Sequence, residues 1–238
     1  MTKHIKTNLH FHTCEDPKHK AIKYTLKEGI DEAANLGFEA LAITCHESFK
    51  WENKASEYAN SKGVLLIPGI EAKIRFTPGK PKKEVIILNC HKDIEKISNI
   101  EELKKYKNAH PEVFILAPHP FFYGNFSLKK DLEKNIEVFN AIEQSWFYSR
   151  IFNRNKKAKK VAEKYNLPFI STSDTHFLNF LNTDYAMIYI EEKTPEAIFR
   201  AIKEKSFKNI TRTKNSFTEM LVPQGLFMLK DFAKKVLR

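Results

Sequence analysis

The chain has 238 residues, of which 42% are hydrophobic, and its formal net charge is +11. This length is enough for one α/β barrel domain or for two small domains, and the hydrophobic content is ordinary for a soluble globule. No apolar stretch approaches membrane-spanning length and the N-terminus has no signal-peptide core, so we expect a cytoplasmic protein without a membrane partner. Three widely spaced cysteines, Cys14, Cys45 and Cys90, argue against a disulfide framework.

The excess positive charge comes almost entirely from lysine. Its dense clusters are Lys156-Lys157 with Lys159-Lys160, and Lys80 with Lys82-Lys83. They lack the interleaved aromatic residues of a nucleic-acid stacking platform, which favours solvated helix faces over a nucleic-acid surface. The total positive field would still help an anionic substrate to arrive.

Short apolar strands alternate with amphipathic helices along the chain. The first strand is followed by a helix that opens at a capping box, Thr25 with Glu28, and closes at Gly37. The last predicted helix begins at Thr194-Pro195, with proline in its first turn. The predicted strands are 5–9, 41–44, 64–67, a hairpin of 72–76 with 85–88, 113–117, 138–142, 169–172 and 185–190, and the other helices are 49–62, 100–109, 128–135 and 153–165.

Serial strand-then-helix units imply a parallel sheet with right-handed crossovers. About seven units favour closure into a barrel, with an open doubly wound sheet as the alternative. No linker or internal repeat interrupts the pattern, so we predict one domain over 1–238, with 217–238 as a C-terminal helical extension packed on the outside.

Metal-binding residue types cluster just past the predicted strand ends. His10 and His12, two residues apart at the end of the first strand, point to the same side, and neutral imidazoles suit zinc, iron and manganese. A barrel brings distant strand ends to one rim, where such enzymes carry their chemistry. The later strand ends carry His46, Glu71, His119, and Asp174 with His176.

These residues lie in the motifs HFHT, ITCHES, PGIEA, PHP and SDTH, which run in this order from His10 to His176. The set resembles the PHP (polymerase and histidinol phosphatase) superfamily of metal-dependent phosphoesterases, and in particular its small stand-alone members. The resemblance implies a distorted (β/α)7 barrel that holds two or three divalent metal ions, such as zinc, manganese or iron.

The resemblance also implies how the ligands are shared. His10 and His12 would bind one metal with Glu71 and Asp174, while Glu71 would bridge to a second metal that His119 helps to hold. His46 and His176 would bind a third. A bridging carboxylate makes chemical sense, because a carboxylate can join two cations and an imidazole cannot. The implied reaction is hydrolysis of a phosphomonoester, of a small metabolite or nucleotide, by a metal-bridging hydroxide, with no protein nucleophile.

Some positions depart from the family pattern. The family usually completes the second metal shell with a histidine early in the next strand; that position falls on Glu84, and His91 is the alternative, which we prefer by ligand type. The family's common aspartate before His46 is Cys45 here. The remaining ligand of the third metal falls between Asp16 and His19, where a turn or an exposed histidine is equally compatible with the sequence.

Arg150 and Arg154 follow the strand 138–142 and are candidates for binding a substrate phosphate, with local pairing as the alternative. Other functions remain open. One is a nuclease or phosphodiesterase acting on oligonucleotides, and another is a non-catalytic PHP-fold subunit that binds nucleic acid. An amidohydrolase also starts its barrel with His-x-His, but it would usually need a metal-bridging lysine; Glu71 and the Asp174/His176 pair fit the PHP pattern better.

Overall fold

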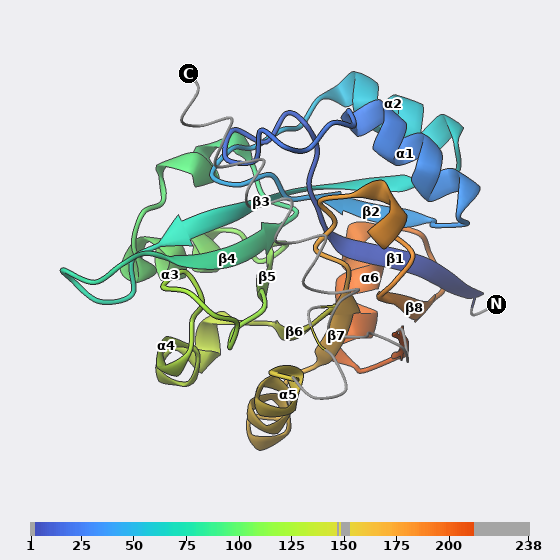
Figure 1. The fold of residues 1–238 in the computed structure, drawn as a ribbon. Coiled ribbons are helices and arrows are strands. Elements are labelled where there is room, and N and C mark those ends of the chain that lie inside the picture. Colours follow the sequence, from blue (N-terminus) through green and yellow to red (C-terminus); the bar gives the residue numbers. More distant parts are fainter. Residues whose placement is uncertain (1–2, 147, 149–152, 212–238) are drawn as a thin grey trace.

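The computed structural model describes residues 3–146, 148 and 153–211. Within these residues, nine strands form one sheet in the order β7-β6-β5-β4-β3-β2-β1-β8-β9 (Figure 1). The strands are β1 (Lys3–Phe11), β2 (Ala40–Ile43), β3 (Leu65–Ile74), β4 (Lys83–Leu88), β5 (Phe114–Ala117), β6 (Ala141–Ser145), β7 (Phe169–Thr172), β8 (Tyr185–Ile190) and β9 (Phe207–Ile210).

The α-helices of the same part of the chain are α1 (Leu26–Asn35), α2 (Asn53–Ser61), α3 (Ile100–Ala109), α4 (Lys130–Lys134), α5 (Asn155–Lys164) and α6 (Pro195–Lys203). Short 3-10 helices occupy Lys92–Lys96, Ile136–Val138 and Leu178–Phe180. The capping box at the start of α1 is confirmed: the Glu28 amide donates to Thr25 Oγ1, and the Thr25 amide donates to a Glu28 carboxylate oxygen.

Two runs of parallel strands, β1–β3 and β5–β7, are joined through β4, which runs antiparallel to both β3 and β5. At the other side of β1, the strands β8 and β9 are also antiparallel to their neighbours. The predicted hairpin is therefore confirmed as β3–β4. The segments 64–67 and 72–76, however, are parts of one long strand, β3, because the register with β4 continues unbroken through Glu71. Glu71 thus lies inside a strand and not at its end.

The sheet closes almost completely into the predicted barrel. At one end, the Thr175 amide donates to the His10 carbonyl and the His12 amide donates to the Thr175 carbonyl, which joins the chain after β7 to the end of β1. Between β9 and β7 the join is made by a side chain. Asn209 accepts a hydrogen bond from the Ser171 amide at 2.8 Å and donates to the Phe169 carbonyl at 2.8 Å.

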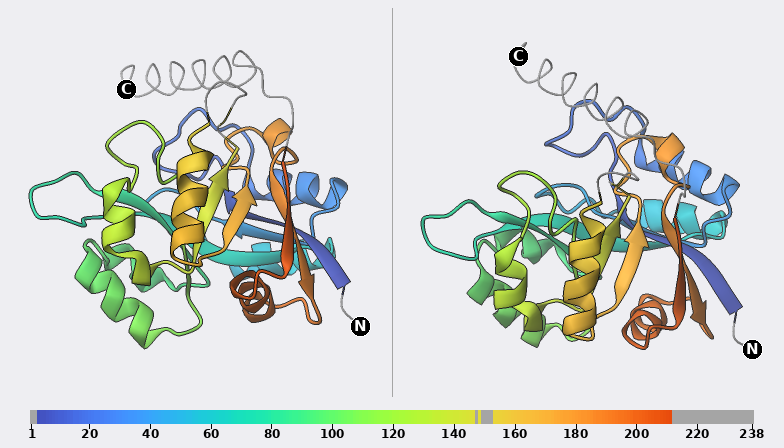
Figure 2. Two further views of the ribbon diagram at one scale, coloured as in Figure 1. Left: turned by 90° about the horizontal axis from the view of Figure 1, so that it is seen from below. Right: turned by 60° about the horizontal axis from the view of Figure 1, so that its bottom comes forward.

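The interior is filled by apolar side chains up to the level of the predicted site. Ile67, Leu88 and Leu116 from three strands form one cluster with α6, and Phe114 stacks on Phe199 of that helix at 4.7 Å between ring centroids. Outside the barrel, α1 and α2 lie side by side over β1–β3, whereas α3, α4 and α5 follow the other half of the sheet (Figures 1 and 2). The barrel is therefore a packed core that is open for chemistry at one end.

A one-residue irregularity in β1 sets the direction of the paired histidines. The pairing of β1 with β2 shifts between Asn8 and Phe11. Leu9 consequently packs in the interior cluster and Phe11 in the outer cluster under α1, although residues two apart in a regular strand share one face. Such a bulge redirects side chains, and here it lets His10 and His12 both face the open end.

Residues 217–238 lie outside the described part of the chain, so the helical extension and the single domain over 1–238 stay predictions. None of the helices in the described ranges has the length and apolarity needed to cross a bilayer.

We predict that Gly29→Ala destabilises the protein although alanine favours helices. Gly29 lies inside α1, and an added Cβ would lie 2.4 Å from the ring of Phe11, which is fully buried. Alanine in a helix normally gains about 0.5–1 kcal/mol over glycine, but overpacking costs about 1–3 kcal/mol. Urea unfolding should show a net loss, whereas Asn35→Ala at an exposed position of the same helix should not; an equal or higher stability of Gly29→Ala would contradict this packing.

Candidate metal centre

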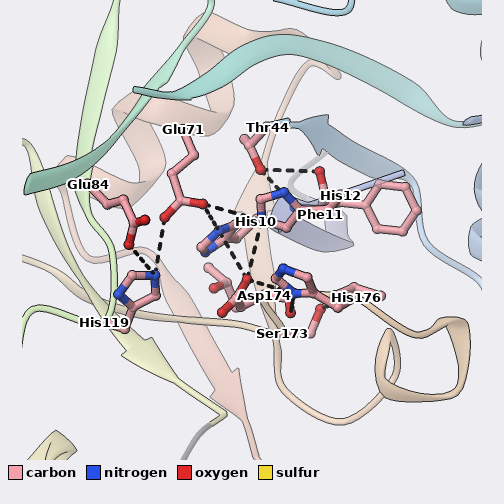
Figure 3. A network of polar contacts seen from close by, with 12 residues as sticks. His10, Phe11, His12, Thr44, Glu71, Glu84, His119, Ser173, Asp174 and His176 are labelled. Atoms are coloured by element: carbon pink, nitrogen blue, oxygen red, sulfur yellow. Dashed lines mark hydrogen bonds and ion pairs between the residues drawn. The ribbon is translucent and has the colours of Figure 1, made fainter. Parts of the chain in front are cut away.

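The histidines and carboxylates of the five motifs converge at the open end of the barrel. They come from β1 and the residue after it, from the chain after β2, from the middle of β3, and from the segments after β5 and β7. Figure 3 shows those from β1, β3 and the segments after β5 and β7. Their side-chain donor atoms form overlapping groups, each within a range that one metal ion could span. The residues brought together are His10, His12, His46, Glu71, His119, Asp174 and His176.

Glu71 is the centre of the cluster, and its two oxygens face different partners. Oε2 lies 2.9 Å from His46 Nε2, 3.3 Å from His10 Nε2 and 3.4 Å from His12 Nε2. Oε1 lies 3.2 Å from His119 Nε2. This division of one carboxylate between two sets of nitrogens is what a bridge between two cations requires.

Asp174 completes the first set. Its Oδ1 lies 3.3 Å from Nε2 of both His10 and His12. Among the described residues, Oδ1 of Asp174 and Nε2 of His12 are buried polar atoms without a hydrogen bond, although they face each other. Asp174 and His119 also have positive φ angles of 44° and 26°, which are costly outside glycine and are typical of functional sites.

Asp16 orients two of the histidines. Its Oδ2 accepts hydrogen bonds from Nδ1 of His12 at 3.0 Å and from Nδ1 of His46 at 2.8 Å, so that both Nε2 atoms point to the centre. Burial opposes ionisation of Asp16, but these two hydrogen bonds outweigh it and hold its pKa below the usual range. Asp16 is thus a supporting residue for ligands and not itself directed at the centre.

Glu143 has the same role for His10, although it was not among the residues predicted from the sequence. This fully buried carboxylate on β6 lies 2.7 Å from His10 Nδ1 and also accepts a hydrogen bond from Thr172. The strand was predicted over 138–142, but it is shifted to Ala141–Ser145, with a 3-10 helix before it. The missed signal is a glutamate inside a buried strand, because such a charge must have a partner.

A third group of nitrogens lies beside the first two. His46 and His176 face His12, with ring centroids 4.4 Å from that of His12 in both cases. The His19 ring lies 4.5 Å from His46 and 4.7 Å from His176, so the structure places His19 next to the expected third metal position.

Glu84, and not His91, completes the cluster, which corrects our preference for His91. Glu84 is buried, with one oxygen 3.9 Å from His119 Nε2 and the other 4.0 Å from His46 Nε2. The His91 side chain is 68% exposed and pairs with Glu112 at 3.7 Å. The reason is the direction of β4: since it runs antiparallel to β3, its beginning lies at the open end and His91, beyond its last residue, lies at the other.

The pKa shifts of the cluster residues show that its carboxylates are stabilised by nearby positive charge. Burial lowers the pKa of a histidine, but nearby carboxylates outweigh it at His46 and His119, whose pKa values rise to about 10 and about 9. At His176, burial and the neighbouring histidines lower the pKa to about 4. Burial, with Glu71 close by, raises the pKa of Glu84 to about 7. Protons on histidines therefore balance charge that bound cations would otherwise balance.

The residues fit divalent cations by donor chemistry as well. Imidazole nitrogens and carboxylates together are the ligand set of zinc, manganese and iron, and buried carboxylates oriented by second hydrogen bonds are typical of such sites. Cys45 is buried against Thr13 and burial raises its pKa to about 12, which fits an inert thiol. Of the two candidate substrate arginines, Arg154 is exposed at the start of α5, and Arg150 lies outside the described residues.

We predict that Asp16→Asn weakens metal binding about 10–100-fold without unfolding the protein. An asparagine has one acceptor oxygen. If that oxygen takes the place of Oδ2, the new amide group opposes the Lys18 amide that now donates to Oδ1; in the reverse orientation it opposes both imidazoles, and in either case the hydrogen bonds to the histidines lose their charge assistance. Metal titration of chelator-treated protein measures the effect, with Glu15→Gln, an exposed neighbour, as the matched control. Unchanged affinity in Asp16→Asn would show that the histidines need no such support.

Residues 152–207 match the family model described as PHP-associated. No curated protein matches the chain.

Three solved structures share the fold at low sequence identity. One is a two-domain protein from Bacteroides vulgatus that contains a predicted PHP-like metal-dependent phosphoesterase, with TM-score 0.65, 16% identity, and 89% of this chain and 66% of that chain covered. The second is a lesion-specific endonuclease from Pyrococcus furiosus, with TM-score 0.58, 14% identity, and 88% and 58% covered. The third is an amidohydrolase from Chromobacterium violaceum, with TM-score 0.53, 14% identity, and 88% and 99% covered.

The chain spans less than two thirds of the first two proteins. Because these structures are described with different activities, the shared fold alone does not determine which reaction a protein catalyses. The PHP-associated match over residues 152–207, together with a fold shared with a predicted PHP-like phosphoesterase, supports the resemblance to the PHP superfamily that the motifs predict.

Proposed function

We propose that the chain is a metal-dependent phosphoesterase that hydrolyses a phosphomonoester of a small metabolite or nucleotide. This proposal rests on the Glu71 carboxylate, whose two oxygens face different sets of imidazoles. Oε2 faces His10, His12 and His46, and Oε1 faces His119. When bound there, two divalent cations would acidify water and neutralise phosphoryl oxygens. A carboxylate in the bridging position favours this reaction class over that of an amidohydrolase.

The chain's own residues hold, orient and shield the site. His10, His12 and Asp174 would bind one cation on the Oε2 side of Glu71. Asp16 and Glu143 keep the imidazole Nδ1 atoms engaged, so that the Nε2 atoms remain available as ligands. The apolar barrel interior beneath the cluster keeps water from reaching the ligands from below.

Arg154 supports an anionic substrate. It lines the same small hollow as His119, together with Ser145 and Asn155. Its guanidinium donates a hydrogen bond to the Tyr123 hydroxyl at 2.9 Å and lies over that ring, which holds it beside the cluster. A guanidinium placed there can bind phosphoryl oxygens that point away from the cations.

A non-catalytic role is less consistent with the same cluster. Buried carboxylates such as Glu71 and Glu143 destabilise a fold unless they are compensated. A protein that only binds nucleic acid gains nothing from keeping them at the open end of its barrel.

We predict that Asp174→Ala lowers kcat/KM for nitrophenyl phosphate at least about 100-fold, because it removes a ligand of the proposed cation pair. His91→Ala should leave it within about twofold, since His91 lies away from the cluster. Assays with added zinc, manganese or iron, on a monoester and on the matching diester, separate a phosphatase from a nuclease-like diesterase. Metal-dependent turnover that survives Asp174→Ala would contradict the site.

We predict that Arg154→Ala raises KM for a phosphomonoester about tenfold with a smaller change in kcat, since one charge-assisted hydrogen bond is worth about 1.5 kcal/mol or more. Lys156→Ala, also exposed on α5, is the control for a general loss of positive charge. Equal effects of the two substitutions on KM would show that substrate binding depends on the overall positive charge and not on a specific contact with Arg154.

A further inference from the structure

We propose that Glu84 is a ligand of the second metal ion and that it makes this site prefer hard cations, such as Mn²⁺ or Mg²⁺, to Zn²⁺. This inference rests on the proposed function, because it assumes that cations bind around Glu71. It concerns the position where the family resemblance leads one to expect a histidine.

The backbone directs Glu84 into the barrel. In the β3–β4 register, Glu84 is opposite Lys73, two residues beyond Glu71 on the same face. Ile86 and Leu88, further along β4, lie in the interior apolar cluster, and side chains two apart share a face. Glu84 is the polar end of an otherwise apolar inward row, which places its carboxylate level with the ligands (Figure 3).

The distances fit a shared cation. Glu84 Oε2 lies 3.9 Å from His119 Nε2, whose other close carboxylate contact is Glu71 Oε1 at 3.2 Å. Glu84 also belongs to a group of buried donors with His46 and Glu71 that one metal ion could span, so its carboxylate lies between the two sides of Glu71. A cation at Oε1 of Glu71 therefore meets two carboxylates, Glu71 and Glu84, and the His119 imidazole.

This donor set differs in kind from one completed by histidine. Carboxylate oxygens suit manganese and magnesium, whereas imidazole nitrogens suit zinc. Replacing an expected imidazole with a carboxylate adds both an oxygen ligand and a negative charge. Each change favours a hard cation over zinc.

Lys73 balances part of that added charge. Its Nζ lies 3.9 Å from Glu84 Oε1, across the two strands, and its side chain is one-third exposed. The ammonium is too far for a tight hydrogen bond, so it can moderate the negative potential while the carboxylate remains available as a ligand. An expected neutral histidine would not need this partner.

The experiment is metal titration of chelator-treated full-length protein. Mn²⁺ binding is followed by the loss of the free-ion electron paramagnetic resonance signal, and Zn²⁺ binding by competition with a chromophoric chelator. The variants are Glu84→Gln, which removes the charge at nearly constant shape, and Glu84→His, which restores the expected ligand. His91→Ala is the matched control at the rejected position.

We expect Glu84→Gln to lose one Mn²⁺ equivalent or to bind it at least about tenfold more weakly. Glu84→His should regain a full complement of Zn²⁺ and shift the ratio of Zn²⁺ to Mn²⁺ affinity at least about tenfold toward zinc. His91→Ala should match the wild type in stoichiometry and affinity. Thermal unfolding of each chelator-treated variant shows whether a loss reflects the site or the fold, and Glu84→His remains the deciding variant if Glu84→Gln does not fold.

Wild-type stoichiometry and affinity in Glu84→Gln, or an unchanged metal preference in Glu84→His, would overturn the inference while leaving the phosphoesterase proposal intact. Bound metal with the predicted Glu84 effects but no phosphate ester hydrolysis would overturn the proposed function alone. A wild-type protein that binds no metal would overturn both.

Discussion

The Glu71 carboxylate is buried at the open end of the barrel, with nitrogens of four histidines between 2.9 and 3.4 Å from its oxygens. An isolated charge in that place would cost several kcal/mol, so the surrounding positive charge is a condition for the fold itself. It can be supplied by protons on histidines or by cations. The pKa values of His46 and His119 are raised, so in the absence of cations protonated histidines supply this positive charge. Metal binding would then release these protons.

Much of the architecture keeps that arrangement in place. The irregular pairing of β1 turns His10 and His12 to one side, while Asp16 and Glu143 fix the orientation of their rings. The reversed direction of β4 brings Glu84 to the cluster. Beneath it, apolar side chains of the strands and of α6 form one buried cluster, on which the histidines and carboxylates lie.

The fold, and the cluster residues that lie next to strand ends, could be predicted from the sequence, because the alternation of strands and helices and the order of the motifs can be read from the chain itself. His46, His119 and Asp174 belong to this class. The choice between Glu84 and His91 was wrong for a different reason. The predicted hairpin already made β4 antiparallel, which brings its beginning to the open end, but the preference for His91 rested on ligand type and did not use that direction. Glu143 was missed because the predicted strand stopped at residue 142, so its place inside the buried strand β6, where a charge requires a partner, was not recognised. Such boundaries depend on tertiary packing and not on local pattern.

The most direct test of the central claim is anomalous X-ray diffraction from crystals of the full chain grown with Mn²⁺. The account predicts separate manganese peaks on the two sides of the Glu71 carboxylate, one beside His10, His12 and Asp174 and the other beside His119. No peak in this cluster, or a peak confined to the surface group of His91, His110 and Glu112, would contradict it.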